Sequence, residues 1–226
     1  MGNFSPNSSH VNQHISHSAG GILDGANPTS FKRENGAHGY TRRLFFGNEK
    51  SMARLPYPDL ARADLAPTAE RIKAERGGRL LNLYRMLLHS PPVADGWRAF
   101  LTAIRQQCRL PGRYRELAIL QVAVLNGAEY EFEAHVPFAL GEGFTRPQLD
   151  ELKNHRPPQG FSDADRAVMD YTEAMTRSIE VPDAIFAGVR RHFAEREVVE
   201  LTATIAAYNL VSRFLVALKV DHEQHQ

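Results

Sequence analysis

Apolar side chains recur with a helical period through most of this chain. In residues 80–90 they fall three and four positions apart, which places them on one face of a helix. The five that share this face are Leu80, Leu83, Tyr84, Leu87 and Leu88. Pro91 and Pro92 follow and end the helix, because a residue before proline avoids the helical region.

The next two segments also have helical patterns. Residues 96–110 carry an apolar stripe that includes Cys108, and a Leu-Pro-Gly break follows. Residues 113–127 are apolar almost all round after Glu116, as expected of a central buried helix. Gly127 is a suitable C-terminal stop for that helix.

Helix-start signals mark the C-terminal half. Thr145 and Gln148 have the spacing of a capping box, and Ser162 precedes a run with acidic residues in its first turn. Pro182 suits the first turn of another helix. Residues 196–220 are long and strongly apolar, which predicts a final buried helix.

The chain divides into two regions of different composition. Residues 1–51 are rich in Asn, Ser, Gly and His and show no apolar periodicity, so we expect a disordered extension. Three interpretations of it stay open: a functional tail, a transit peptide, or a stretch ahead of a true start at Met52. Residues 52–226 are expected to form one all-α domain of about seven or eight helices, because no segment alternates with the period of a strand.

The overall composition excludes several classes of protein. The 27 basic and 26 acidic side chains nearly balance, which leaves no basic surface for nucleic acid. We find no uncharged apolar run of about eighteen residues and no secretory signal, so we expect a cytoplasmic protein that does not span a membrane. Cys108 is the single cysteine, which excludes an intramolecular disulfide, a CxxC pair and every cysteine-based zinc motif.

The strongest candidate for chemistry is Glu131 with His135. Four positions apart on a helix, the two side chains share a face. A carboxylate beside an imidazole favours the protonated ring and raises its pKa, which suits acid–base work near neutral pH. The alternative is an exposed pair that only supports the helix. Pro137 is expected to kink the helix beside this pair, which fits a site but also fits the start of a new helix.

Two further polar sets lie within apolar helices. Glu116 either points outward or has a partner, for which Arg113 and Arg115 are candidates. The second set is Tyr208, Asn209 and Arg213. It fits either a substrate carboxylate or acidic groups at a subunit contact, because arginine suits both roles.

Common catalytic motifs do not occur in this sequence. It contains no HExxH, GxSxG or P-loop pattern, and the GEG at 141–143 lacks the third glycine of a dinucleotide fingerprint. Glu131 and His135 alone would supply two of the three protein ligands that a catalytic metal usually has, so no metal site is predicted. Cys108 lies on an apolar stripe and is interpreted as a small buried hydrophobic residue.

One stretch resembles a known family. Residues 113–145, RYRELAILQVAVLNGAEYEFEAHVPFALGEGFT, are similar to the core of the carboxymuconolactone decarboxylase family, which includes alkylhydroperoxidase D. The resemblance covers most of residues 79–154 and is weaker in the C-terminal helices. It rests on an R-x-R-E-L helix, a Y-E-x-x-x-H segment and the turn that follows.

The sequence departs from the peroxidase branch of that family at its thiols. In that branch a helix glutamate is followed by a C-x-x-C-x-x-x-H motif. Here Glu116 and His135 match the glutamate and the histidine, whereas Ala128 and Glu131 stand at the cysteine positions. A dithiol peroxidase needs thiolates there. The resemblance therefore implies the decarboxylase-like branch, whose members are all-α, use no cofactor and assemble as homotrimers or homohexamers.

The resemblance also implies roles for individual residues. The reaction of that branch removes CO₂ from a carboxylated unsaturated lactone, which needs charge stabilisation at the lactone carbonyl and an acid that protonates carbon. His135 would be the proton donor, Glu131 would tune it, and Glu116 would anchor the relay. The candidates for binding the small-molecule substrate are Tyr130, Arg113, Tyr208, Asn209 and Arg213.

Other functions stay open on the same residues. One is a different cofactor-free reaction of a small acid, such as isomerisation or ring opening. Another is a non-catalytic helical oligomer that binds a small molecule. A perturbed pKa of His135 inside a closed pocket would favour an enzyme over a binding protein.

Overall fold

A computed structural model describes residues 52–223, so the extension expected at 1–51 lies outside the described residues. Within 52–223 the chain forms nine helices and no strand, which confirms the all-α prediction and exceeds the expected count of seven or eight. The helices are α1 (Ala66–Glu75), α2 (Asn82–Leu87), α3 (Pro91–Gln106), α4 (Gly112–Asn126), α5 (Glu129–Gly141), α6 (Arg146–Lys153), α7 (Asp163–Arg177), α8 (Asp183–Arg190) and α9 (Glu195–Leu218).

The helix start and stop signals at Thr145, Ser162 and Gly127 act as predicted. Thr145 and Ser162 each complete a capping box at the start of α6 and α7. Gly127 follows α4 with a φ of 64°, a left-handed conformation that glycine adopts without strain. Pro91 begins α3 rather than only ending the preceding helix, because a first-turn residue needs no backbone N–H.

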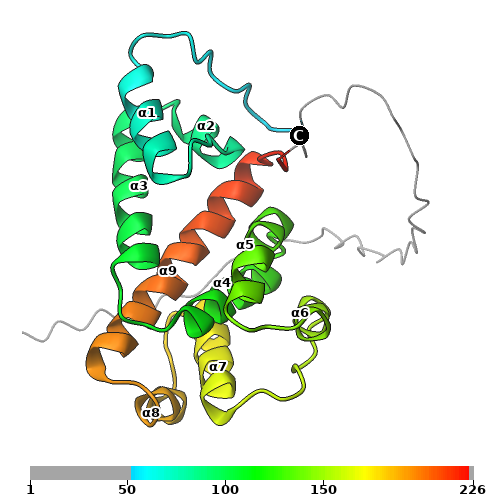
Figure 1. Ribbon diagram of the computed structural model, residues 1–226. Coiled ribbons are helices and arrows are strands. Elements are labelled where there is room, and N and C mark those ends of the chain that lie inside the picture. The colour runs from blue at the N-terminus through cyan, green and yellow to red at the C-terminus, as the bar shows by residue number, and fades with distance from the viewer. Residues whose placement is uncertain (1–51, 224–226) are drawn as a thin grey trace, which may run out of the picture. The chain divides into compact units, whose positions relative to one another are not determined.

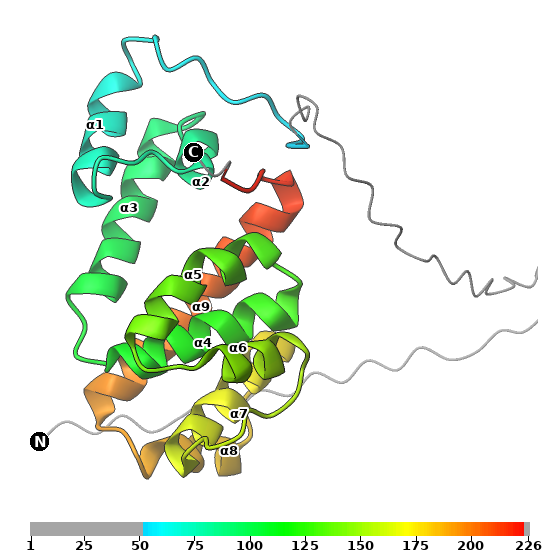
Figure 2. The same ribbon diagram turned by 45° about the vertical axis from the view of Figure 1, so that its right-hand side comes forward.

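Helix α9 runs through the middle of the folded unit, with α1–α3 on one side and α4–α7 on the other (Figures 1 and 2). It packs against α3, α4, α5, α7 and α8. Its length and composition would allow it to cross a membrane, a feature that the search for an uncharged run missed. Since 44% of its apolar window is buried by neighbouring helices, packing inside the bundle accounts for much of its apolar character.

Helix α4 is the second central element. It packs against α5, α6, α7 and α9, and its side chains from Glu116 through Ala123 are all buried. This explains why the segment is apolar all round, as the sequence predicted. An acidic side chain in such a helix must find a partner in the interior.

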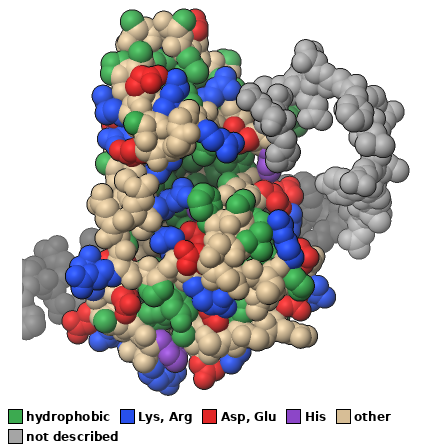
Figure 3. All heavy atoms as spheres, viewed as in Figure 1, with side chains coloured by type: hydrophobic (Ala, Val, Ile, Leu, Met, Phe, Trp, Pro, Cys, Tyr) green, Lys and Arg blue, Asp and Glu red, His purple; other side chains and the backbone are tan. Residues whose placement is uncertain are grey.

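The C-terminal tail ties the α1–α3 part to α5. Glu223 accepts hydrogen bonds from the backbone N–H of Asn82 at 2.7 Å and from the Tyr130 hydroxyl at 2.6 Å. Between the α1–α3 part and the rest, hydrophobic side chains gather in a recess, while charges of both signs are spread over the surrounding face (Figure 3).

Candidate active site

The centre of the candidate site is a buried contact between α4 and α5. Nδ1 of His135 lies 2.7 Å from Oε2 of Glu116, and both side chains are buried. Nε of Arg115 donates to the other oxygen, Oε1, at 3.1 Å. The Glu116 carboxylate thus has a donor on each oxygen, which satisfies a charge that would otherwise be costly inside the fold.

The protonation states of this pair follow from burial and from each other. Burial alone would raise the pKa of Glu116, but the hydrogen bond from His135 and the guanidinium of Arg115 hold it below its usual value. Burial lowers the pKa of His135 more strongly than Glu116 raises it. The ring is therefore neutral, with Nδ1–H donated to the carboxylate and Nε2 able to accept a proton.

Aromatic rings enclose the imidazole. Tyr208 of α9 meets it edge to face, with ring centroids 5.1 Å apart, and Phe138 lies at 5.7 Å. Arg105 of α3 stacks over the Phe138 ring, 4.7 Å from its centroid. Burial raises the pKa of Tyr208, so its phenol stays neutral. This enclosure holds the ring in an apolar setting with one polar partner.

Glu131 has a different partner from the one its spacing predicted. Ser212 of α9 donates to Glu131, with Oγ 3.1 Å from each carboxyl oxygen, and among the described residues no hydrogen bond or ion pair joins Glu131 to His135. Burial raises the pKa of Glu131 well above its ordinary value, and only Ser212 opposes it. Burial therefore favours the neutral carboxylic acid form of Glu131, and the ring is oriented by Glu116 instead.

The helix that carries both groups is continuous. α5 runs through Pro137 to Gly141, so the proline does not start a new helix. Glu131 and His135 are buried on the face that meets α4 and α9. The alternative of an exposed surface pair is thus wrong.

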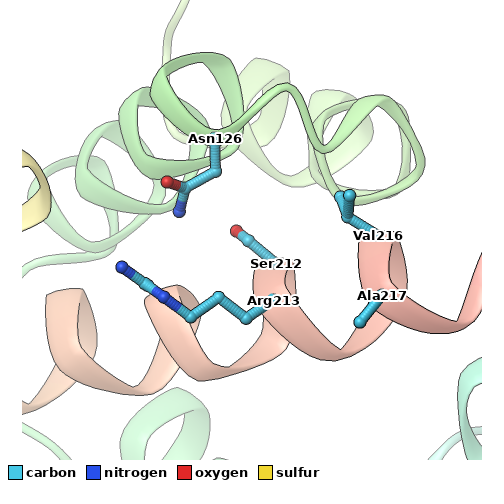
Figure 4. A pocket seen from close by; sticks show the side chains of 5 residues that line it. All are labelled: Asn126, Ser212, Arg213, Val216 and Ala217. Carbon is cyan, nitrogen blue, oxygen red and sulfur yellow. The ribbon is translucent and has the colours of Figure 1, made fainter. Parts of the chain in front are cut away.

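Asn209 and Arg213 form a separate polar group on α9. Nη1 of Arg213 donates to the backbone oxygen of Asn209 at 3.0 Å and to its Oδ1 at 2.6 Å. Asn126 of α4 donates to the same Oδ1 at 3.1 Å. Beside this group lies a pocket of about 340 Å³ (Figure 4). Its walls are Asn126, Ser212, Arg213, Val216 and Ala217.

Two of the proposed substrate-binding residues lie elsewhere and are committed to structural contacts. Arg113 makes a two-pronged pair with the buried Asp165, at 2.9 and 3.1 Å. The Tyr130 hydroxyl donates to Glu223. Burial is the larger cause, and this contact the second, that raises the pKa of Tyr130. These two side chains therefore have structural partners, whereas Tyr208 contacts the His135 ring and Asn209 and Arg213 lie beside the pocket. The substrate-binding role of all five stays a prediction.

Ser212 is the residue that sequence reasoning missed. It lies one turn after Tyr208 and is fully buried, so the two share a face of α9. It contacts Glu131 and also lines the pocket. A small polar residue within an apolar helix was the only signal available.

Neither a metal cluster nor a reactive thiol stands out near these groups. No group of three His, Cys, Asp or Glu side chains that could hold a metal occurs among residues 52–223. Cys108 is half-buried, and burial raises the pKa of its thiol. A thiol of this kind is a poor nucleophile near neutral pH.

Comparison with known proteins finds one family and one relative with a similar sequence. Residues 91–174 match the carboxymuconolactone decarboxylase family. The uncharacterized protein YdfG of Bacillus subtilis (strain 168) is 27% identical over 106 residues, which are 46% of this chain and 72% of YdfG.

Solved structures share the fold at low sequence identity. A peroxidase-related protein with an alkylhydroperoxidase AhpD core, from Ralstonia eutropha JMP134, has a TM-score of 0.67 and 20% identity over 78% of this chain and 95% of its own. A protein of unknown function from Agrobacterium tumefaciens has a TM-score of 0.56 and 24% identity, over 61% of this chain and 94% of its own. A variant of the debrominase Bmp8 in complex with 2,3,4-tribromopyrrole has a TM-score of 0.63 and 18% identity, over 77% of this chain and 94% of its own.

Proposed function

We propose that this chain, a member of the carboxymuconolactone decarboxylase family through residues 91–174 with an alkylhydroperoxidase D-like fold, is a cofactor-free enzyme that transfers protons on a small carboxylated lactone or related acid. The buried set of Glu116, His135 and Glu131 carries the proposal. Their pKa shifts favour a carboxylate at Glu116, a neutral imidazole at His135 and a neutral carboxylic acid at Glu131. An enzyme that moves protons to and from carbon needs an acid and a base ready at the same pH.

Loss of CO₂ from a carboxylated unsaturated lactone is the first candidate reaction. The bond between the ring carbon and the carboxylate breaks, and its electron pair moves through the unsaturated system to the lactone carbonyl oxygen. CO₂ leaves, and a proton then adds to carbon, so one hydrogen replaces the carboxylate. We assign this proton to Glu131, because its neutral carboxyl already holds one.

His135 takes a different part from the donor role suggested by the resemblance. A neutral ring whose Nδ1–H is committed to Glu116 accepts at Nε2. In our proposal it takes up a proton from solvent and returns it to Glu131, one turn away on the same helix. The Glu116 carboxylate stabilises the imidazolium that forms in between. Both residues are then needed for repeated turnover.

A proton shift within an unsaturated acid or lactone is the second candidate reaction. Here Nε2 of His135 would remove a proton from one carbon, while Glu131 would deliver a proton to another. The observation in its favour is that both groups lie on one helix and their pKa values shift in opposite directions. The shift favours a deprotonated base at His135 and a protonated acid at Glu131. No CO₂ is released in this case.

Dithiol peroxidase activity is not part of the proposal. Ala128 and Glu131 occupy the positions where a thiol pair would be needed, and the Cys108 thiol has a raised pKa. Hydroperoxide consumption with a dithiol donor is therefore expected to be absent. Clear activity in that assay would contradict this interpretation of the two positions.

Product analysis in deuterated water tests the proposal. The wild-type protein is incubated with freshly generated carboxymuconolactone and with its decarboxylated enol-lactone, without added metal or cofactor. CO₂ release with one deuterium on carbon would support decarboxylation, whereas deuterium exchange without CO₂ would support the proton shift. If neither signal appears with either compound, the result contradicts enzyme activity on this substrate class and favours a binding protein.

A further inference from the structure

The pocket beside α9 has a fixed cation on one side. Arg213 is held by two hydrogen bonds through a single nitrogen, Nη1, to the backbone and side-chain oxygens of Asn209. Asn209 is itself buried and donates to Oγ1 of Thr176 at 3.0 Å. The guanidinium is therefore oriented before any ligand arrives, which reduces the entropy lost on binding.

The remaining donors of this guanidinium are available. Within residues 52–223 no Asp or Glu forms an ion pair with Arg213, and its two hydrogen bonds use only Nη1. Its Nε and Nη2 groups form the planar fork that matches a carboxylate. Figure 4 shows the Asn126 amide and the Arg213 guanidinium beside the same space. The polar side of the pocket thus suits an anion with planar oxygens.

The opposite side of the pocket is apolar. Val216 and Ala217 line it, and both are exposed to solvent. A fully hydrated inorganic anion gains nothing from these side chains, whereas the carbon skeleton of an organic acid would cover them. The combination selects an organic carboxylate with a short apolar body.

Ser212 connects this pocket to the proposed proton donor. Its side chain lines the pocket and also donates to Glu131, 3.1 Å away. We propose that the pocket formed by Asn126, Ser212, Arg213, Val216 and Ala217 binds the carboxylate that a small unsaturated organic acid keeps during the reaction. This inference rests on the proposed function for its link to catalysis, but the binding site itself does not. It defines the substrate class as acids that retain one carboxylate after proton transfer.

Calorimetric titration tests the pocket without any turnover. The probes are sorbate, its neutral amide sorbamide, and inorganic phosphate. The wild-type protein is expected to bind one sorbate per chain, and sorbamide and phosphate at least about tenfold more weakly, because each lacks either the charge or the apolar body. Failure of sorbate to bind the wild type at millimolar concentration would overturn the proposal.

Three variants locate the binding. Arg213→Gln is expected to weaken sorbate binding about tenfold or more, and Ala217→Phe to block it by filling the pocket while keeping the cation. Arg156→Gln, which changes an exposed arginine outside the pocket, is the matched control and is expected to bind like the wild type. Each variant is first checked for an unchanged melting temperature. Unweakened binding by folded Arg213→Gln would contradict the proposal.

A fourth variant separates this inference from the proposed function. Glu131→Gln removes the proton donor but none of the pocket's lining residues, so sorbate binding is expected to persist while turnover is lost. Binding that depends on Arg213 in a protein without turnover would remove the proposed function and keep the pocket. Turnover that Arg213→Gln does not change would remove the pocket and keep the proposed function.

Discussion

Glu116 and His135 are nineteen positions apart, yet Oε2 of the first lies 2.7 Å from Nδ1 of the second inside the protein. The contact joins α4 to α5, and it fixes which ring nitrogen carries the proton. It leaves Nε2 as the acceptor. The chemistry that we propose for the chain depends on this relationship.

Replacing Glu116 with Gln should lower turnover and move its pH dependence. Burial lowers the pKa of His135, while the hydrogen bond and charge of Glu116 raise it, so removing that charge should lower the pKa further. Because the neutral ring is the active form, the acid limb of the pH–rate profile should shift to lower pH. Turnover at neutral pH should fall about 100-fold. Glu129→Gln, at an exposed site, is the control, and an unmoved acid limb in Glu116→Gln would contradict the assignment.

Replacing Glu131 with Gln should change how stability depends on pH. Burial raises the pKa of this carboxyl well above 4.5 in the folded protein. Above about pH 4.5 the unfolded chain releases a proton that the folded protein keeps. The free energy of unfolding therefore falls as pH rises, by up to about 1.4 kcal/mol per pH unit, until pH passes the folded pKa. Glutamine cannot ionise, so urea unfolding at several pH values should show that this decline is absent. Equal slopes in both proteins would count against a protonated Glu131.

Replacing Arg113 with Met should destabilise the fold. Its partner Asp165 is buried and would be left as an unpaired carboxylate. We expect a loss of about 3 kcal/mol, at the low end for a buried pair because the Arg113 side chain is 28% exposed. The double variant with Asp165→Asn should recover most of this in chemical denaturation. Full stability combined with lost substrate affinity would return Arg113 to the substrate-binding group.

Replacing Tyr130 with Phe should affect stability and not catalysis. The hydroxyl donates to Glu223 at 2.6 Å, which helps hold the C-terminal tail against α5. Its loss should cost about 1 kcal/mol of unfolding free energy. Turnover per folded molecule should stay at the wild-type value. A variant with intact stability and lost turnover would show that Tyr130 contacts substrate.

Local sequence signals were sufficient for most of the fold. Capping residues such as Thr145 and Ser162 act within one turn of their own helix, so their effect could be predicted without knowing the neighbours. Helix α1 was not identified, because its apolar pattern is weak. It buries only Thr68, Ala69 and Ile72.

The site could be predicted only in part, because its contacts join different helices. The i, i+4 rule placed Glu131 with His135 on one face, and both are buried there. Their hydrogen-bond partners come from elsewhere: Glu116 on α4 for the ring and Ser212 on α9 for the carboxyl. Spacing along one helix carries no information about such partners. The family resemblance was the only indication that Glu116 meets His135.

The most direct test compares CO₂ release from carboxymuconolactone by the wild type, His135→Ala and His192→Ala, with loss of the lactone's ultraviolet absorbance as a second readout. His192 is exposed on another part of the fold and serves as the matched control. We predict turnover by the wild type and by His192→Ala, and a fall of at least about 100-fold in folded His135→Ala. Full turnover by His135→Ala would contradict the claim that the buried Glu116–His135 pair returns a proton to Glu131 in each cycle.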